Sequence, residues 1–352
     1  MAIIDLRSDT VTQPTEAMRD AIYNVALGDD VYGEDPSTIR LEEMAARLMG
    51  KEAALLVSSG TMGNLASLLV HCSRGDEVIL GSEAHIFHYE AGGMSALGGI
   101  FPHLVPNQSD GTMLIEDIEG AIRGDDIHFP RTRLICIENT HNRCNGIPLT
   151  VEYTGSVVKL AKNYGLKVHL DGARIFNAAV TLGVEAAELT RGVDSVSFCL
   201  SKGLSAPIGS VLCGSKEFVA EARRIRKILG GGMRQTGIIA AAGIVALDDM
   251  TKRLEEDHRN ARRFAEGVAG IPGFSVDLEY VKTNIVFFDL TGDRMSDEDV
   301  LASADEKGLK FLSLGPSRFR VVTHCGIGAD DIDRALEILR EIMSNELKVE
   351  VS

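Results

Sequence analysis

The chain contains no tryptophan, and aromatic residues make up only 5% of its 352 residues. Proteins that bind single-stranded nucleic acid stack bases on aromatic side chains, so the sequence does not favour this mode of binding. Acidic residues also outnumber basic ones, and 36 Lys and Arg against 51 Asp and Glu give a net charge of −15. Phosphate backbones and anionic lipids repel such a molecule. We therefore expect no nucleic-acid partner and no membrane partner.

Paired cysteines, long apolar runs and a secretory signal are also absent from the sequence. The six cysteines are scattered and form no Cys-x-x-Cys pair, so they predict neither a disulfide framework nor a metal site. No run approaches the roughly 18 consecutive apolar residues that a membrane-spanning helix needs. Residues 1–9 lack the basic start, apolar run and cleavage site of a secretory leader. These absences favour a cytoplasmic protein with reduced thiols.

The remaining composition is that of an ordinary globular protein, with 45% apolar and 25% charged residues. At about 150 residues per domain, the length suggests two domains. From about Lys51, short apolar runs alternate with helical patterns, which is typical of a mostly parallel sheet covered by helices on both faces. The patterns predict strands at 53–57, 77–80, 133–137, 167–170, 195–200 and 211–213, and helices at 61–71 and 151–164.

The pattern changes after Arg234. A long helical stretch at 238–268 leads into strands at 274–277, 283–290 and 319–323, with helices at 296–307 and 330–346. Ser296 and Asp299 form the capping pattern that begins one of these helices. We expect a large α/β domain over residues 1–248 and a smaller α+β domain over residues 249–352.

A lysine follows directly after one predicted strand. The strand at 195–200 leads into Ser201, Lys202 and Gly203, so an amine lies at the carboxyl end of a sheet strand. Ligands of open α/β sheets bind beyond these strand ends. A partly desolvated amine there is a candidate for Schiff-base formation. Taken alone, the pattern also fits a loop lysine that points into water.

A carboxylate follows the neighbouring predicted strand. The strand at 167–170 ends in Asp171, followed by Gly172 and, two residues later, Arg174. An isolated Asp in this position commonly caps the next helix. An Asp and a Lys at neighbouring strand ends, however, are what pyridoxal 5'-phosphate requires. The lysine holds its aldehyde, and the carboxylate keeps the ring nitrogen protonated so that the ring can accept electrons.

A third segment, Ser58-Ser-Gly-Thr-Met-Gly-Asn64, lies between a predicted strand and a predicted helix. Small residues, a hydroxyl and the free N–H groups of a helix start can hold a phosphate. The segment is neither a dinucleotide-binding G-x-G-x-x-G motif nor a P-loop, which argues against nucleotide cofactors. Alone it also fits a routine helix start. Together with Lys202 and Asp171 it specifies pyridoxal 5'-phosphate.

Five segments of the chain resemble the low-specificity L-threonine aldolase family. They are DLRSDTVT (5–12), GDDVYG (28–33), HLDGARIFN (169–177), LSKG (200–203) and GGGMRQ (230–235). The resemblance covers residues 3 to about 330. It implies the fold of the type I pyridoxal phosphate enzymes, in the aspartate aminotransferase class. It also implies a lyase that forms glycine and acetaldehyde from L-threonine or L-allo-threonine, and a homotetramer whose active sites are shared across a dimer.

The resemblance also assigns cofactor contacts. Lys202 would bind the aldehyde, Asp171 would pair with the ring nitrogen, and Arg174 would keep the phenolic oxygen ionised. Phosphate contacts are implied for Gly60, Thr61, Ser201 and Arg234, of which Arg234 resembles an arginine donated by the partner subunit.

Two histidines and an arginine resemble residues that act on the substrate. His85 would stack on the cofactor ring and His128 would lie near the substrate hydroxyl. The base that removes the hydroxyl proton is left open between His85, His128 and a water that they hold. Arg320, assisted by Ser8, would bind the substrate carboxylate, because a guanidinium group can bind both oxygens in one plane.

Two assignments around the substrate are less direct. Arg318 is a rival to Arg320 by position, although Arg320 matches the family arginine. Tyr32 and Glu90 are candidate members of the pocket, and Tyr32 is expected to contact the substrate.

Other functions stay open at the level of the sequence. The chain could be another pyridoxal phosphate lyase acting on a β-substituted amino acid, such as a phenylserine-type aldolase or a β-eliminating lyase. A cofactor carrier without catalysis would require a broken substrate site, whereas Ser8, His85, His128 and Arg320 are all present. A nucleotide-binding regulator lacks any phosphate-binding fingerprint for nucleotides.

Overall fold

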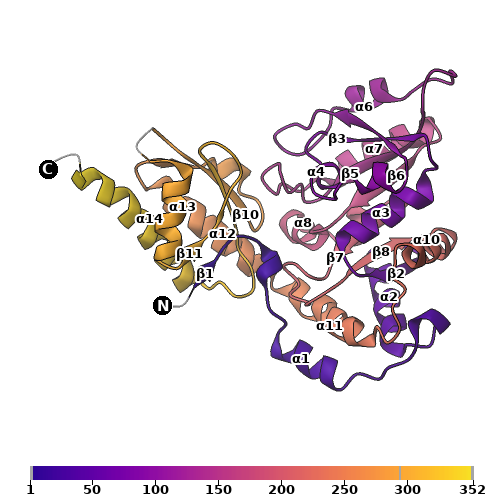
Figure 1. Ribbon diagram of the computed structural model, residues 1–352, viewed down its shortest axis with the longest axis horizontal. Helices are drawn as coiled ribbons and strands as arrows, with labels where there is room; N and C mark the ends of the chain where they lie inside the picture. The colour runs from indigo at the N-terminus through magenta and orange to yellow at the C-terminus, as the bar shows by residue number, and fades with distance from the viewer. Residues whose placement is uncertain (1–2, 293–294, 350–352) are drawn as a thin grey trace.

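The computed structural model describes residues 3–292 and 295–349 of the chain. Two lobes lie side by side, and a sheet forms the centre of each (Figure 1). The larger lobe contains most of the first 250 residues, and the smaller lobe contains the C-terminal part together with the N-terminal strand. The N-terminal segment therefore passes from the smaller lobe into the larger one.

The larger lobe is built on a seven-stranded sheet in the order β2-β8-β7-β6-β5-β3-β4. Only β8 runs against the other strands, because it pairs antiparallel with both β7 and β2. The carboxyl ends of the other six strands therefore lie at one edge of the sheet. The strands are β2 (Ala53–Val57), β3 (Asp76–Gly81), β4 (Phe101–Val105), β5 (Arg131–Glu138), β6 (Lys167–Asp171), β7 (Ser195–Cys199) and β8 (Ser210–Gly214).

Helices cover both faces of this sheet. In β2, Leu55 and Val57 pack in one hydrophobic cluster while Ala54 and Leu56 pack in another, so the strand is apolar on both sides. One face carries α3 (Gly60–His71), α4 (His85–His88), α5 (Gly93–Ala96) and α10 (Lys216–Ile228). The other carries α2 (Pro36–Leu48), α6 (Ile115–Ala121), α7 (Val151–Asn163), α8 (Ile175–Leu182), α9 (Ala186–Leu189) and α11 (Gly237–Asp248), with α1 (Glu16–Tyr23) packed on α11.

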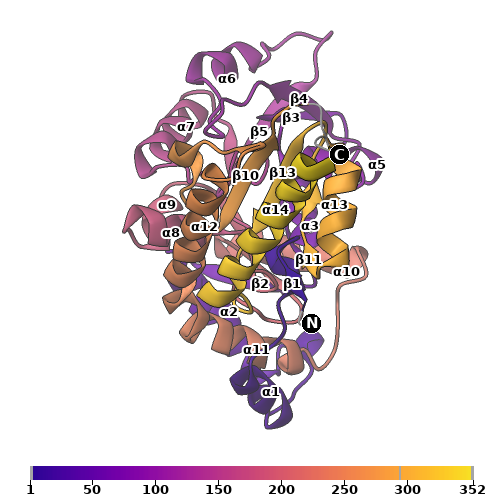
Figure 2. The same cartoon turned by 90° about the vertical axis from the view of Figure 1, so that its left-hand side faces the viewer.

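The smaller lobe contains a four-stranded antiparallel sheet in the order β12-β13-β10-β9. Its core is aromatic, and the ring of Phe288 contacts those of Phe264, Phe274, Phe311 and Phe319. Figure 2 shows α12, α13 and α14 on the outer side of this lobe. The elements are β9 (Phe274–Ser275), β10 (Ile285–Leu290), β12 (Leu312–Ser313), β13 (Arg318–Val322), α12 (Leu254–Ala269), α13 (Asp297–Glu306), α14 (Ala329–Val349), and the parallel pair β1 (Ile4–Asp5) and β11 (Leu309–Lys310).

The predicted α/β fold class is confirmed, and the predicted strands of the larger sheet agree with the structure to within a few residues. The predicted helix at 238–268 is wrong as one element. It is divided into α11, a short 3-10 helix at Met250–Lys252, and α12. Its two ends pack differently, since Leu247 belongs to the cluster of the larger lobe and Phe264 to that of the smaller lobe.

Strand β4 is not predicted from the sequence. It lies at the edge of the sheet, contains Pro102 and exposes half of Phe101, so it lacks the apolar pattern of a buried strand. The division of the chain at residue 248 stays a prediction. Among the described helices, none combines the length and the apolar character needed to cross a membrane.

The first prediction concerns the anchor of the N-terminal segment. Leu6 is fully buried in the core of the smaller lobe, and its backbone bonds to Lys310 and Val322. We expect Leu6→Ala to lower the free energy of unfolding by about 2–5 kcal/mol, because it opens a cavity in a packed core. Ile3→Ala, at a side chain that is 62% exposed, serves as the control and should change it by less than about 0.5 kcal/mol. Equal effects of the two variants in urea unfolding would show that Leu6 is not an anchor.

The second prediction concerns pH. Burial lowers the pKa of His71 to about 4, that of His169 to about 3 and that of His258 to about 4. These groups stay neutral in the folded chain, whereas in the unfolded chain they take up protons below about pH 6.5. Their contribution to stability is therefore complete above about pH 6.5 and is lost as the pH falls toward 4.

Each such histidine adds a slope of up to about 1.4 kcal/mol per pH unit in this window. His258→Gln should keep hydrogen bonds to Asn177 and Thr181 but remove one titrating group, so its unfolding free energy should fall less steeply between pH 6.5 and 4. Urea unfolding at several pH values measures both slopes. Parallel curves for the variant and the wild type would contradict the prediction.

Candidate active site

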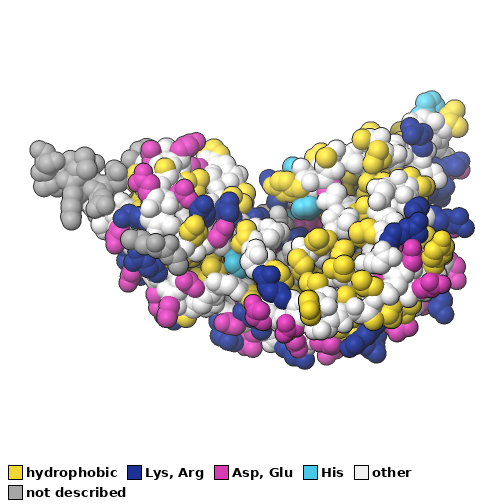
Figure 3. Space-filling model, turned by 60° about the horizontal axis from the view of Figure 1, so that its bottom comes forward, with side chains coloured by type: hydrophobic (Ala, Val, Ile, Leu, Met, Phe, Trp, Pro, Cys, Tyr) yellow, Lys and Arg dark blue, Asp and Glu magenta, His cyan; other side chains and the backbone are white. Residues whose placement is uncertain are grey.

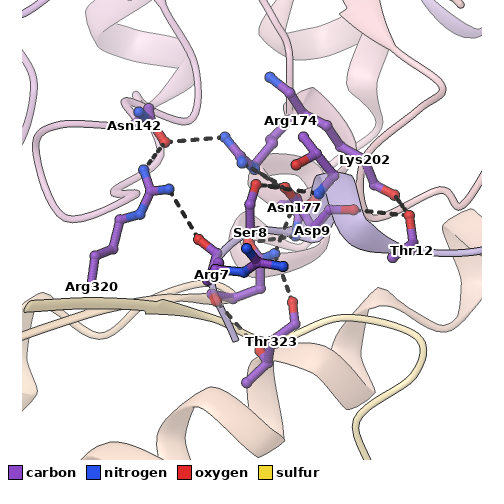
Figure 4. A network of polar contacts seen from close by, with 12 residues as sticks. Arg7, Ser8, Asp9, Thr12, Asn142, Arg174, Asn177, Lys202, Arg320 and Thr323 are labelled. Carbon is purple, nitrogen blue, oxygen red and sulfur yellow. Dashed lines mark hydrogen bonds and ion pairs between the residues drawn. The ribbon is translucent and has the colours of Figure 1, made fainter. Parts of the chain in front are cut away.

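The carboxyl edge of the larger sheet brings together polar residues from several strand ends. Gly60 follows β2, His85 follows β3 and Asn142 follows β5, while Asp171 ends β6 and Lys202 follows β7. Because these strands are parallel to one another, residues far apart in the sequence meet at one edge. The edge faces the smaller lobe, from which Arg320 on β13 approaches (Figure 4).

A cavity of about 320 Å³ lies between the lobes at this edge. Figure 3 shows the hollow between them from outside. Five of the predicted site residues line the cavity, whereas Leu312 and Leu314 add an apolar wall from the smaller lobe. The lining residues are Ser8, Thr10, His85, Tyr89, Asn142, Arg174, Lys202, Leu312, Leu314 and Arg320.

Arg174 forms a buried ion pair with Asp9 of the N-terminal segment (Figure 4). Its Nε and one terminal nitrogen donate to the two carboxylate oxygens of Asp9 at 2.7 and 2.6 Å. Burial alone would raise the pKa of Asp9, but the charge and hydrogen bonds of Arg174, with the charge of Lys202, hold it at about 2. Arg174 therefore binds an internal carboxylate at the cavity wall.

The guanidinium group of Arg320 is not fully hydrogen-bonded. It donates to Asn142 Oδ1 at 3.1 Å and to the carbonyl of Arg7 at 3.3 Å, while its buried Nε has no hydrogen-bond partner among the described residues. Burial and the nearby charge of Arg174 lower the pKa of Arg320 to about 10. A buried cation with a free donor favours an anionic ligand in the cavity. The rival Arg318 points elsewhere and stacks over Phe287 outside this cavity.

Asp171 is buried at the end of β6. Its Oδ2 accepts a hydrogen bond from Asn64 Nδ2 at 2.8 Å, and its Oδ1 accepts one from the N–H of Ala173 at 3.1 Å. The chain can turn here because Gly172 lies against β7, where a Cβ would come within 2.9 Å of the carbonyl oxygen of Ser197. These two hydrogen bonds fix the Asp171 carboxylate beside β7, the strand that leads to Lys202.

His85 is held by two glutamates. Its backbone N–H donates to Glu138 at 2.7 Å, and its ring Nδ1 lies 2.9 Å from Glu90. Burial would lower the pKa of His85, but the hydrogen bond to Glu90 and the charges of Asp171 and Glu138 outweigh it and raise the pKa. With Nδ1 committed to Glu90, Nε2 is the ring nitrogen left for a ligand.

The start of α3 lies close to the end of β7. Ser59 caps the helix by accepting a hydrogen bond from the N–H of Met62 at 3.2 Å. A Cβ at Gly60 would lie 3.0 Å from Cys199 Sγ, so the glycine allows close contact just before Lys202. Thr61 is exposed, and the first N–H groups of a helix have no partner within it. Ser201, beside Lys202, is half-buried.

Seven predicted residues are not in the lining of this cavity. Four of them follow or end strands at the same sheet edge, namely Gly60, Thr61, Asp171 and Ser201, and the other three lie elsewhere. His128 lies on the loop after α6, where its ring bonds to Asp126 and its side chain is 79% exposed. Arg234 and Tyr32 lie together, with the guanidinium carbon of Arg234 5.9 Å from the ring centre of Tyr32, and Tyr32 is 73% exposed. The single chain therefore does not bring His128, Arg234 or Tyr32 to Lys202.

Besides Asp9, sequence reasoning missed three polar residues that organise the site. Asn142 bridges Arg320 and Arg174 through its Oδ1, and Glu138 binds the backbone of both His85 and Asn142. Glu138 ends β5 and Asn142 follows it. Both could have been predicted as polar residues at the carboxyl end of a strand. Asn64, one turn into α3, carried no such signal.

Comparisons with known proteins identify the family. A model of the beta-eliminating lyase family matches residues 5–291. The chain is 49% identical to low-specificity L-threonine aldolase 1 of Arabidopsis thaliana, covering 97% of both chains, and 43% identical to the low specificity L-threonine aldolase of Escherichia coli, covering 94% of this chain and 96% of the relative.

Solved structures agree on the fold. The threonine aldolase of Leishmania major superposes with a TM-score of 0.83 at 20% identity, covering 97% of this chain and 99% of the other. A structure of the enzyme SPT with pyridoxal phosphate superposes with a TM-score of 0.76 at 17% identity, covering 98% and 88%. With relatives this similar along its whole length, the chain belongs to the low-specificity L-threonine aldolases within the beta-eliminating lyase family.

Proposed function

We propose that the protein is a pyridoxal 5'-phosphate-dependent lyase that cleaves L-threonine and L-allo-threonine to glycine and acetaldehyde. The names of its relatives support this activity. The observation that carries the proposal is the meeting of Lys202 and Arg320 in one cavity, with Asp171 on the strand beside Lys202. One cavity thereby offers an amine for an aldehyde and a guanidinium group for a carboxylate.

The residues present fit the cofactor. Lys202 offers a primary amine, buried Asp171 offers a carboxylate for a protonated ring nitrogen, and Gly60 and Thr61 offer helix N–H groups for a phosphate, with Ser201 beside them. When bound, pyridoxal phosphate supplies an aldehyde that condenses with amines and a ring that accepts the electron pair of a broken bond. The protein's part is to hold that ring and orient the substrate.

We assign the substrate carboxylate to Arg320. Its unpartnered Nε and its terminal nitrogens can donate to both oxygens, and Ser8 lines the cavity beside it with a hydroxyl. Fixing the carboxylate would also fix how the other bonds at Cα are oriented toward the bound cofactor. Arg320 therefore selects the bond that breaks, and the Cα–Cβ bond is the one that yields glycine.

We assign the β-hydroxyl proton to Nε2 of His85, directly or through a water. His85 lines the cavity, and its contact with Glu90 stabilises the positive charge that the ring gains on taking up a proton. His128 is not available for this role within its own chain because its side chain is exposed on a distant loop.

We further propose a homotetramer in which each dimer shares its active sites. The support is the position of Arg234, Tyr32 and His128, which are exposed and outside the cavity of their own chain. A neighbouring subunit would receive them, with Arg234 directed to the cofactor phosphate. The six free thiols are consistent with a cytoplasmic protein, and glycine biosynthesis is the metabolic role that its product implies.

The third prediction tests the reaction. The purified protein with pyridoxal phosphate should release acetaldehyde and glycine in equal amounts from L-threonine and L-allo-threonine, and none from the D-isomers. Lys202→Ala should lose both turnover and the visible absorbance of the bound cofactor. Arg318→Ala, outside the cavity, is the matched cation control and should keep both. 2-Oxobutanoate and ammonia as the products from L-threonine would instead indicate β-elimination.

The fourth prediction tests the shared sites. Lys202→Ala and Arg234→Ala should each be nearly inactive, but co-expression should restore about a quarter of wild-type activity, since half of randomly paired dimers carry one intact site. Lys202→Ala with Arg320→Ala is the control, because both residues belong to the same chain's cavity and no mixed dimer has an intact site. No recovery in the first mixture would contradict shared sites.

A further inference from the structure

Asn64 lies between two buried carboxylates at the carboxyl edge of the sheet. The side chain comes from α3, and the residue is 1% exposed. Its amide nitrogen donates to Glu90 Oε1 and to Asp171 Oδ2, both at 2.8 Å. The same Glu90 oxygen contacts His85 Nδ1 at 2.9 Å. One amide group therefore joins Asp171, assigned to the ring nitrogen, with His85 through Glu90, and the family resemblance implies that His85 stacks on the ring.

The orientation of the Asn64 amide is fixed from its other side. Its Oδ1 accepts hydrogen bonds from Ser197 Oγ at 2.6 Å and from His169 Nε2 at 3.1 Å. His169 is fully buried and stays neutral, and its Nδ1 contacts Ser195 Oγ at 2.9 Å. All hydrogen-bonding positions of the amide are thus occupied, so the NH₂ group can only point at the two carboxylates.

The two carboxylates lie close together. One ligand atom from each of His85, Glu90 and Asp171 lies within 4.8 Å of the others. Burial and the charge of Asp171 raise the pKa of Glu90, whereas the hydrogen bonds from His85 and Asn64 act in the opposite direction. The Asn64 NH₂ group occupies the space where the two negative charges would otherwise face each other without a donor between them.

We propose that Asn64 is a positioning residue, whose amide holds Asp171 toward the ring nitrogen of the cofactor and Glu90 on His85 at the same time. The inference rests on the proposed function, because it takes the cofactor assignment from there. It adds that Ser197 and His169 act through Asn64 by fixing the direction of its NH₂ group. The two proposed contacts to the ring are therefore coupled and not independent.

The test uses Asn64→Asp, which keeps the shape of the side chain but replaces the donor with a third carboxylate. Its affinity for pyridoxal phosphate, titrated into the apoprotein, should fall about tenfold or more, because two buried acceptors lose their donor. The pH midpoint of the visible absorbance of the bound cofactor, measured without substrate, should move upward because added negative charge favours the protonated form.

Two further variants separate positioning from folding. Ser197→Ala removes only one contact that orients Asn64, so it should move the affinity and the midpoint in the same directions but less. Asn260→Asp is the matched control, because this buried amide donates to the carbonyl of Ile327 in the smaller lobe, away from the cavity. It should lower the melting temperature of the apoprotein without changing cofactor affinity or the midpoint.

Unchanged affinity and midpoint in Asn64→Asp would overturn the inference. If that variant does not fold, Ser197→Ala provides the test. Wild-type cofactor affinity and midpoint in Ser197→Ala would then overturn the inference. If Asn260→Asp changes the cofactor affinity and the pH midpoint by the same amounts, the effect of Asn64→Asp is general destabilisation, and the inference is overturned as well. A wild-type protein that binds no pyridoxal phosphate would remove the proposed function and this inference together. If the wild-type protein cleaves threonine and Asn64→Asp has wild-type cofactor affinity and midpoint, only the inference is removed.

Discussion

The buried ion pair between Asp9 and Arg174 is the interaction that holds the N-terminal segment against the larger lobe at the cavity wall. Asp9 follows an anchor in the smaller lobe, where Leu6 is buried, and Arg174 begins α8 of the larger lobe. Removing two charges from water is costly unless both are fully hydrogen-bonded, and the two-pronged contact meets that condition. Asn284 of the smaller lobe adds a weaker contact to Asp9 at 3.4 Å. The pair thus fixes the cavity wall and the place of Ser8 together.

Local pattern and sheet topology were enough to predict Asp171, Lys202 and Gly60, whereas the family resemblance was needed to predict Ser8, His85, Arg174 and Arg320. Asp171 and Lys202 could be predicted because each follows a short apolar strand, and parallel strands bring their carboxyl ends to one edge. Gly60 could be predicted for the same reason, as the first residue of the helix after β2. These predictions need only the order of elements along the chain and the rule that ligands bind beyond strand ends.

The rest of the site depends on contacts that no local pattern encodes. Asp9 meets Arg174 across 165 positions of sequence, and Asn64 meets Asp171 across 107. Their residue types fit caps and turns equally well, so only the fold reveals the partners. His128 was predicted from its likeness to a family histidine but lies outside the cavity of its own chain. That likeness does not indicate which subunit's cavity it would serve.

The charges around the cavity explain why it suits an amino acid. Asp9 neutralises Arg174, and the contacts of Glu90 with His85 and Asn64 account for the buried carboxylate on the other side. Arg320 differs, because within the described part of the chain no carboxylate lies at ion-pair distance from it. A buried guanidinium group without a counter-charge is costly in an empty site and favourable when a carboxylate enters. The fold therefore leaves the charge of Arg320 for the substrate carboxylate to neutralise, in the same cavity as the amine that the substrate must reach.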